Sequence, residues 1–204
     1  MYKAALTVET QKVLDKIQSL DVLRDFYLAG GTALALQLGH RKSIDLDFFT
    51  PNQLSNDLLT QSLIPFKPTI TQQDKMTLNT LIDNVKVSFL NYPYPLLEKT
   101  VRFQNIELAS VLDIACMKLI AVAQRGTKKD FVDLYTILNT YKLGEILQAC
   151  EKKYQGVNYQ RLHILKSLVY FDDANNDPNP DYLIPTNWNN IKGVLGRSCK
   201  HSGQ

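Results

Sequence analysis

The stretch FYLAGGTALALQLGHRKSIDLDFFT, residues 26–50, decides how the rest of the chain is interpreted. A short apolar run at residues 26–29 ends at Gly30 and Gly31, which indicates a buried strand followed by a turn. Residues 32–38 have the composition of a helix, and Gly39 is placed to cap it. Residues 43–50 alternate between apolar and polar side chains, so we expect a strand with one acidic face.

The glycines and aspartates of this stretch point to a phosphate and metal site. Glycines at the start of a helix let a phosphate approach the backbone, where free N–H groups and the helix dipole favour an anion. Asp45 and Asp47 share one strand face, with Cβ atoms about 7 Å apart. Such a pair suits Mg²⁺ together with a substrate phosphate. Asp-x-Asp alone is usually a solvated strand face and Gly-Gly alone a turn, but their order here favours function.

Periodicity and turn signals predict the remaining elements. Asp83 and Asn84 are expected to form a hairpin turn inside a meander of strands between residues 68 and 91. Residues 172–181 are polar and predict a loop. Further helices are predicted over residues 7–26, 51–63, 111–124, 128–139, 143–154, 159–171 and 188–195. The layout is a mixed α/β front half and a helical back half.

Composition narrows the class of protein. The chain has 204 residues, 45% of them apolar, which suits a folded core and argues against disorder. Its net charge of +3 is too small to indicate nucleic-acid binding by itself. Neither a signal peptide nor a membrane-spanning apolar run is visible, and the three cysteines are widely spaced. We therefore expect a reduced, cytoplasmic protein without a membrane partner.

A second group of charged residues lies in CMKLIAVAQRGTKKDFVDLYTIL, residues 116–138. Lys118 and Arg125 are seven residues apart and share a helix face, and Asp130 and Asp133 share another. Lys129 and Asp133 have the spacing of an ordinary surface ion pair. The alternative to a functional role is a helix surface covered with such ion pairs. For Arg125, Lys129 and Asp133 both interpretations stay open.

Together the two motifs resemble the nucleotidyltransferase superfamily. Its pattern is an apolar residue, Gly, Gly or Ser, about a dozen residues, and then Asp-apolar-Asp/Glu-apolar. Residues 29–31 and 45–48 match it, and the charged residues 118–133 resemble the downstream motif of the AbiEii-type branch. That branch contains toxins of bacterial type IV toxin–antitoxin and abortive-infection systems, and the MenT toxins are in the same broad group. The resemblance covers residues 26–139.

The resemblance implies an α+β nucleotidyltransferase fold, a small mixed β-sheet flanked by helices, followed by a helical C-terminal region. We place the α/β core at residues 1–108 and the helical region at residues 109–204. The implied reaction moves an NMP group from an NTP to an acceptor hydroxyl on RNA, such as a tRNA end, or on a protein. If the toxin resemblance holds, a cognate antitoxin is a further expected partner.

The implied site has a metal centre and a phosphate cradle. Asp45 and Asp47 are expected to bind Mg²⁺ or Mn²⁺, Lys118 to contact the triphosphate, and Asp130 to orient Lys118 or the attacking hydroxyl. Arg41 is a loop cation that is either solvated or steadies a phosphate. The expected phosphate-binding residues are Gly30, Gly31, Thr32, Arg41, Lys118 and Arg125. The expected RNA-binding basic cluster is Lys118, Arg125, Lys128 and Lys129.

One position departs from the superfamily pattern. Many members carry a third carboxylate on a later strand, and the equivalent residue here is Ser88, with Lys86 on the same strand face. Either Asp130 supplies the base, or one metal suffices, or the enzyme is weak. Two alternative functions therefore remain: transfer to a small molecule, as in aminoglycoside nucleotidyltransferases, and a catalytically weak module that binds nucleotide or a partner.

Overall fold

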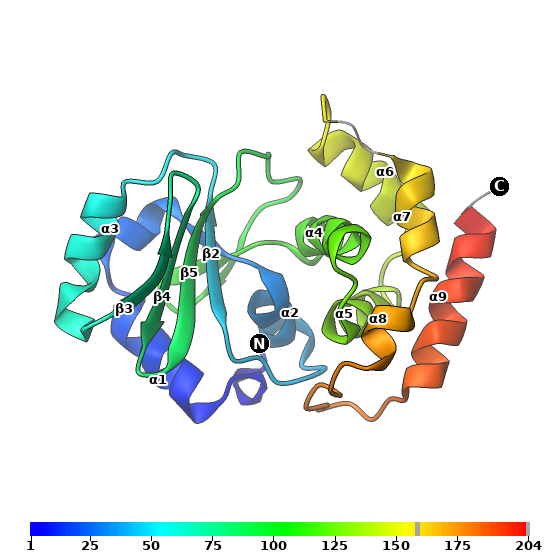
Figure 1. Cartoon of the computed structure of the whole chain (residues 1–204), viewed down its shortest axis with the longest axis horizontal. Coiled ribbons are helices and arrows are strands. Elements are labelled where there is room, and N and C mark those ends of the chain that lie inside the picture. The colour runs from blue at the N-terminus through cyan, green and yellow to red at the C-terminus, as the bar shows by residue number, and fades with distance from the viewer. Residues whose placement is uncertain (158–159, 203–204) are drawn as a thin grey trace.

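A mixed seven-stranded sheet forms the N-terminal half of the structure, a computed structural model that describes residues 1–157 and 160–202 (Figure 1). Its strands are β1 Tyr27–Leu28, β2 Leu46–Thr50, β3 Thr69–Gln73, β4 Thr77–Ile82, β5 Val85–Asn91, β6 Val101–Phe103 and β7 Ile106–Leu108. Their order across the sheet is β3-β4-β5-β2-β1-β7-β6. The predicted α+β class, a mixed β-sheet flanked by helices, is therefore confirmed.

The central strand β2 carries the acidic face. It runs parallel to β5 and antiparallel to β1. Leu46 and Phe48 are buried on one face of β2, where Phe48 stacks on Phe89. Asp47 and Phe49 alternate with them and are only partly covered. The core on one side of β2 thus fixes which side chains point to the other.

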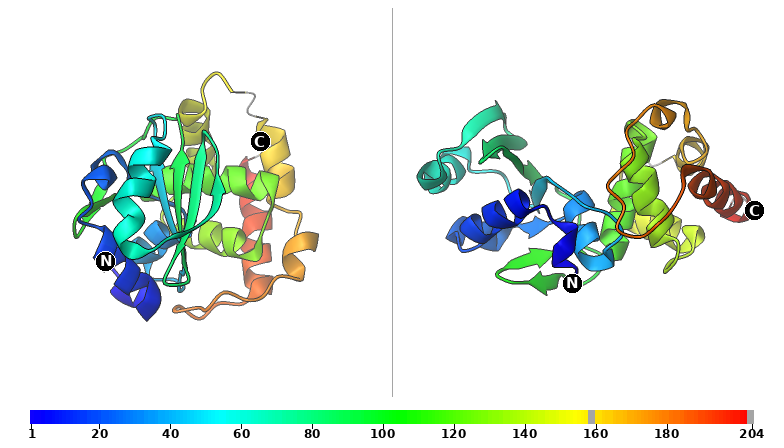
Figure 2. Two further views of the ribbon diagram at one scale, coloured as in Figure 1. Left: turned by 60° about the vertical axis from the view of Figure 1, so that its left-hand side comes forward. Right: turned by 90° about the horizontal axis from the view of Figure 1, so that it is seen from below.

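The N-terminal half contains three helices and three short 3₁₀ helices. The helices of the N-terminal half are α1 Val8–Ile17, α2 Gly30–Leu38 and α3 Asn56–Leu63, with short 3₁₀ helices η1 Lys3–Ala5, η2 Asp21–Asp25 and η3 Ile64–Phe66. Thr7 caps α1 by accepting a hydrogen bond from the Thr10 N–H. In Figures 1 and 2, α1 and α3 lie on the side of the sheet away from the C-terminal helices.

The C-terminal half is helical and is arranged around α4. Its helices are α4 Val111–Gln124, α5 Lys128–Ile137, α6 Leu143–Lys153, α7 Arg161–Ser167, α8 Asp172–Asn175 and α9 Trp188–Ser202. Helix α4 contacts α2, α5, α6 and α7, so it lies between the sheet half and the outer helices (Figure 1). Buried residues of both halves belong to one hydrophobic cluster.

The segment between α8 and α9 returns to the sheet half. The Lys42 N–H donates to the Asp181 carbonyl, and the Leu183 N–H donates to the His40 carbonyl. Lys42 and Asp181 also form an ion pair of 3.3 Å. In Figure 2 this orange segment runs along the bottom of the molecule towards the sheet. The C-terminal helices are therefore tied to the loop that precedes β2.

Several predicted boundaries were wrong for physical reasons. The helix predicted from residue 51 begins at Asn56, because the Asn91 amide donates to the carbonyls of residues 50–52 and holds them in a turn. Residues 172–175 of the predicted loop form α8. The helix predicted over 188–195 continues to Ser202, and β6 and β7 were missed. The helix predicted from residue 159 begins outside the described residues.

Two further observations concern turns and membranes. Asp83 and Asn84 have φ values of 48° and 63°, so the predicted hairpin turn is confirmed. Among the described residues, no helix combines the length and the apolar character that a membrane crossing needs.

Candidate active site

The N-terminus of α2 lies against Asp47 and Arg41. Gly30 has φ 66°, and a Cβ placed on it would lie 3.2 Å from Asp47 Oδ2. A Cβ on Gly31 would overlap the Arg41 guanidinium. The close approach of these side chains therefore favours glycine at both positions, and the left-handed backbone favours it further at Gly30. The glycine pair and the acidic strand meet at one place, as the sequence predicted.

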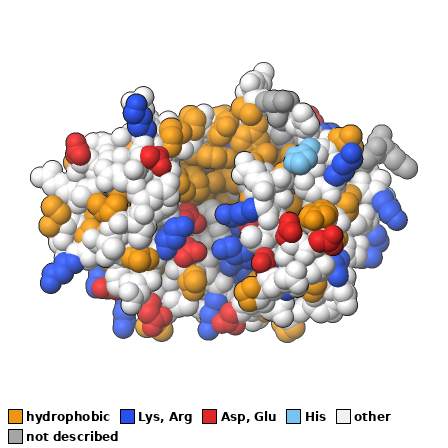
Figure 3. Space-filling view, viewed as in Figure 1, with side chains coloured by type: hydrophobic (Ala, Val, Ile, Leu, Met, Phe, Trp, Pro, Cys, Tyr) orange, Lys and Arg blue, Asp and Glu red, His pale blue; other side chains and the backbone are white. Residues whose placement is uncertain are grey.

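Asp45 and Asp47 line a cleft of about 1280 Å³ between the sheet and the helical half. Figure 3 shows this hollow, where acidic, basic and hydrophobic side chains meet. Burial raises the pKa of Asp47, and the negative charge of Asp45 raises it further. A divalent cation between the two carboxylates would remove that repulsion. Asp45 and Asp47 therefore fit a metal that completes its coordination with phosphate and water.

The described residues do not supply a larger metal cage. Among them, no group of three or more His, Cys, Asp or Glu side chains has the arrangement to hold an ion. Ser88 lies directly beside Asp47, because the two are register partners on β5 and β2. Ser88 therefore lies next to the acidic pair, on the strand where the third carboxylate was expected. Asp83 is at the hairpin turn, where it pairs with Lys16 at 2.5 Å.

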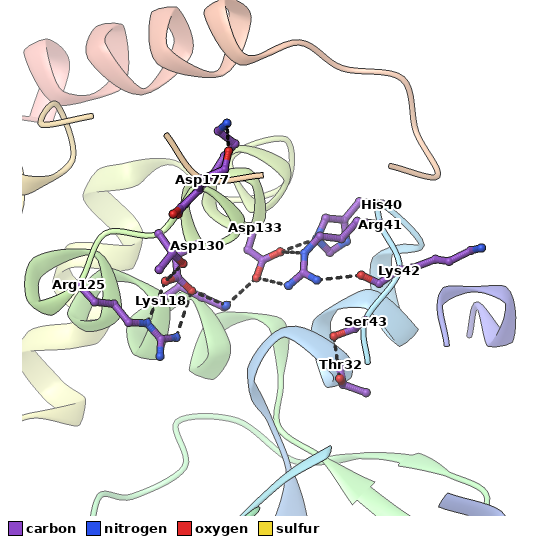
Figure 4. Close-up of polar contacts among 12 residues, drawn as sticks. Thr32, His40, Arg41, Lys42, Ser43, Lys118, Arg125, Asp130, Asp133 and Asp177 are labelled. Atoms are coloured by element: carbon purple, nitrogen blue, oxygen red, sulfur yellow. Dashed lines mark hydrogen bonds and ion pairs between the residues drawn. The ribbon is translucent and has the colours of Figure 1, made fainter. Parts of the chain in front are cut away.

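The Thr32 side chain forms its hydrogen bonds within the protein. Its side chain is buried, and its hydroxyl lies 2.8 Å from the Ser43 hydroxyl and within hydrogen-bonding distance of the Asp45 carbonyl (Figure 4). This differs from the phosphate contact that we expected of it. Thr32 instead fixes the first turn of α2 to the backbone that carries the acidic pair.

The second sequence motif folds into a buried charge network (Figure 4). Lys118 Nζ lies 2.8 Å from Asp130 Oδ1 and 2.6 Å from Asp133 Oδ2. Arg41 binds Asp133 with two hydrogen bonds, from Nε at 2.7 Å and from Nη2 at 2.9 Å. His40 Nε2 lies 2.7 Å from the same carboxylate. The network connects α4 and α5 to the loop before β2, so it joins the two halves at the cleft.

Asp130 is the other acceptor of this network. It receives hydrogen bonds from Lys118, from Arg125 Nε at 3.1 Å and from the Thr127 hydroxyl at 2.6 Å. Burial alone would raise the pKa of Asp130, but Lys118 and its other donors hold it below the usual value. A carboxylate with a lowered pKa and every neighbour donating to it is a poor proton acceptor. The geometry disfavours Asp130 as the base and suits it to orienting Lys118.

Asp133 is even more strongly stabilised as an anion. Although burial opposes it, Lys118 and Arg41 hold the pKa of Asp133 well below the usual value. Asp133 is therefore not paired with Lys129, which is exposed. Three cations, Arg41, Lys118 and Arg125, share two carboxylates. The surplus positive charge lies in the cleft wall that faces Asp45 and Asp47.

The expected basic cluster is smaller than predicted. Lys118 is 5% exposed and Lys128 is 6% exposed, so neither is free to contact RNA. Lys128 donates to the carbonyls of Asn175 and Asp177 and anchors the segment after α8. Arg125 and Lys129 remain exposed. Helix spacing indicated that these cations were close but not which of them the tertiary structure buries.

Sequence reasoning missed the apolar end of the cleft. Phe49, Leu90, Tyr92 and Tyr94 line it together with Tyr154 from the helical half. Phe49 continues the alternation of Asp45 and Asp47, so the period of two could have placed it on the same face. The position of Tyr154 depends on tertiary contacts that a local pattern does not contain.

Most of the chain matches one known protein family. The model of a family described as "Nucleotidyl transferase AbiEii toxin, Type IV TA system" matches residues 13–93 and 65–197. An uncharacterized protein of Aquifex aeolicus (strain VF5) is 40% identical over an alignment of 202 residues, with 96% of this chain and 96% of that protein covered.

Two solved structures share the fold. MenT4, a nucleotidyltransferase toxin of Mycobacterium tuberculosis H37Rv, has a TM-score of 0.60 and 13% identity, with 97% of this chain and 86% of that chain covered. JHP933 of Helicobacter pylori has a TM-score of 0.57 and 16% identity, with 99% and 93% covered. At sequence identities this low, the structural similarity to these two proteins shows a shared fold and no more.

Proposed function

The chain belongs to the AbiEii family of type IV toxin nucleotidyltransferases, and on that premise we propose that it transfers an NMP group from an NTP to a hydroxyl at an RNA end. In this reaction the acceptor oxygen forms a bond to the α-phosphorus, the bond between that phosphorus and the bridging oxygen breaks, and pyrophosphate leaves. The hydroxyl proton is released. The observation that carries the proposal is the convergence of Asp47, Gly30 and Lys118 on one cleft.

Asp45 and Asp47 would hold a Mg²⁺ or Mn²⁺ ion, which when bound supplies positive charge against the phosphate oxygens. The N–H groups at the start of α2 bind phosphate oxygens. Gly30 and Gly31 let the side chains of Asp47 and Arg41 lie against this end of the helix. Lys118 contributes charge from the opposite wall, held there by Asp130 and Asp133. These groups act by positioning and by electrostatic stabilisation, which dominate phosphoryl-transfer chemistry.

Removal of one charge of the acidic pair tests the reaction. Asp47→Asn is expected to lower the incorporation of labelled nucleotide into RNA by about 10²-fold or more. Asp21→Asn is the matched control, because Asp21 is an exposed aspartate whose ion pair with Arg24 lies away from the cleft. Equal labelling by the two variants would rule out the proposed role of Asp47. Nucleotide binding without turnover on any acceptor would favour the alternative of a binding module.

The acceptor is proposed from charge in the cleft. Lys86 on β5 and Lys129 on α5 are exposed, line opposite walls, and form no ion pair with another described residue. RNA held by such cations should lose affinity as salt rises, by nearly one log unit per log of salt for each phosphate contacted. Affinity for the acceptor that does not change with salt would favour a small molecule, and labelling of protein alone would favour a protein acceptor.

Toxicity follows from the family and is proposed for this chain. Expression in a bacterial host is expected to arrest growth, and co-expression of a cognate antitoxin is expected to relieve the arrest. Asp47→Ala should abolish the arrest while Asp21→Asn retains it. Arrest by both variants at equal protein levels would show that nucleotide transfer does not cause it.

A further inference from the structure

The lining of the cleft changes from polar to apolar along the neighbouring strands β2 and β5. Asp47 lies opposite Ser88 in the register of β2 and β5, and Phe49 lies opposite Leu90. Residues two apart on a strand point to the same face and are about 7 Å apart. The polar pair is thus followed at once by an apolar pair on the same face. An apolar surface begins about 7 Å from the carboxylates proposed to hold the metal.

Aromatic rings extend this surface into a continuous wall. The centroids of Phe49 and Tyr92 are 5.5 Å apart, those of Tyr92 and Tyr94 4.8 Å, and those of Tyr94 and Tyr154 4.9 Å. Met117 and Ile120 of α4 line the same cleft from the helical half. The large hydrophobic area in the hollow of Figure 3 agrees with this composition. We call Phe49, Leu90, Tyr92, Tyr94 and Tyr154 the aromatic wall.

The aromatic wall is fixed in place before any ligand binds. The Tyr92 and Tyr154 hydroxyls are 2.6 Å apart, which links the sheet half to α6. Lys153 Nζ donates to the Pro95 carbonyl and to Asp113, each at 2.7 Å. Asp113 also accepts the N–H groups of Leu97 and Glu98. The segment after β5 is thus held by a buried ion pair, and a preformed surface binds a ligand with little loss of entropy.

The order of groups along β2 and the residues just before it indicates which ligand fits the cleft. Arg41 and Ser43 lie beside Gly31 at the start of α2, Asp47 lies beside Gly30, and Phe49 follows. An extended nucleotide has its phosphate tail at one end and its base at the other. With the tail at Gly31 and Arg41 and the reacting phosphate at Asp47, its base extends towards Phe49.

We propose that the aromatic wall is the binding site for the base of the incoming nucleoside triphosphate. This inference rests on the proposed function, because it uses the phosphate position given there. Flat apolar faces stack on any base, so the wall supplies affinity for nucleotides in general and little choice among the four bases.

The test compares a nucleotide with its phosphate tail alone. Binding of ATP and of inorganic tripolyphosphate, each with Mg²⁺ and without acceptor, is measured by calorimetry for the wild-type protein, Phe49→Leu and Tyr94→Leu. Each variant keeps an apolar side chain and removes one ring. ATP affinity is expected to fall roughly tenfold in each, since a stacked aromatic ring contributes about that much per base, with tripolyphosphate affinity unchanged. Tyr141→Leu, an aromatic residue outside the cleft, is the control and should change neither affinity.

The outcomes separate this inference from the proposed function. Unchanged ATP affinity in both variants would overturn the inference while wild-type binding of tripolyphosphate upholds the phosphate site. Unchanged ATP affinity with a raised KM for RNA would overturn it in favour of the acceptor base. If the wild-type protein bound neither ATP nor tripolyphosphate, the proposed function itself would fail. Retained tripolyphosphate binding also shows that each variant is folded.

Discussion

Replacement of Asp133 by Asn should destabilise the protein more than any change to a surface charge. Asp133 is fully buried and accepts from His40, from Arg41 at two positions, and from Lys118. Asparagine keeps the size of the side chain but removes its charge and turns one acceptor into a donor. In the variant Arg41 has no carboxylate partner, and its buried guanidinium is left uncompensated. Lys118 keeps Asp130.

The magnitude follows from these contacts. Breaking a buried ion pair by removing one partner costs about 3–5 kcal/mol, because an uncompensated charge stays buried. For a chain of this length each 1 kcal/mol shifts Tm by roughly 2–4 °C, so we expect a decrease of about 10 °C. Asp21→Asn is the control, since the pair of Asp21 with Arg24 is largely exposed and such pairs contribute less than about 1 kcal/mol.

The assay is urea unfolding followed by circular dichroism at several pH values. Because the pKa of Asp133 is lowered in the folded protein, its stabilising effect is complete above the unfolded-state pKa of about 3.9. The effect is lost as pH falls through the lower folded-state pKa. The free energies of unfolding of the wild-type protein and Asp133→Asn should therefore differ by a constant amount between about pH 5 and 8 and converge in stronger acid.

Two results would refute this reasoning. The first is a loss of stability at pH 7 no larger than that of Asp21→Asn, which would mean that the cations do not depend on Asp133. The second is a difference that widens as the pH falls below 4, because protonation of Asp133 in the wild-type protein must bring it closer to the variant.

Three other substitutions have defined outcomes. Gly30→Ala forces a Cβ against Asp47 at a left-handed φ, so we expect a loss of about 1–2 kcal/mol in urea unfolding and weaker Mn²⁺ binding by electron paramagnetic resonance; unchanged values would contradict the close approach. Lys128→Ala removes the contact with the segment after α8, and limited proteolysis should cut residues 176–187 faster than in the wild-type protein, unlike in Lys129→Ala. Ser88→Asp adds a carboxylate opposite Asp47, so titration should detect a second bound Mn²⁺ per chain; an unchanged stoichiometry would mean that the added carboxylate does not reach the ion.

The sequence predicted those elements whose structure depends on residues close together in the chain. Helix α4 begins after the Ser110 cap, and the hairpin turn at Asp83 and Asn84 has the backbone that these residues favour. Strands β6 and β7 were missed because each has only three residues, and β7 exists through parallel pairing with β1, some 80 residues earlier in sequence. Helix α9 was predicted too short because Gly193 and Gly196 lower helix propensity, whereas burial of Ile191 and Leu195 holds its face against the core.

The same distinction between local signals and long-range contacts applies to the candidate site. Short-range spacing put Asp45 and Asp47 together, whereas the expectation that Asp130 orients Lys118 came from the family resemblance. Spacing did not show that Arg41 would meet Asp133, because the two are 92 residues apart in sequence. Helix periodicity identifies a shared face but not what that face packs against. Whether a cation contacts solvent or lies buried was therefore decided by the tertiary fold.

Stability alone does not account for a buried network of this kind. Replacing buried ion pairs with well-packed apolar side chains is often neutral or stabilising, so the network of Arg41, Lys118, Asp130 and Asp133 needs another reason to occupy the wall of the cleft. That reason is its asymmetry. The network holds more cations than carboxylates when Arg125 is included, and it directs the surplus towards the side where a triphosphate would carry its charge. Held rigidly, such cations need no reorganisation during transfer, which is the condition under which electrostatic stabilisation is largest.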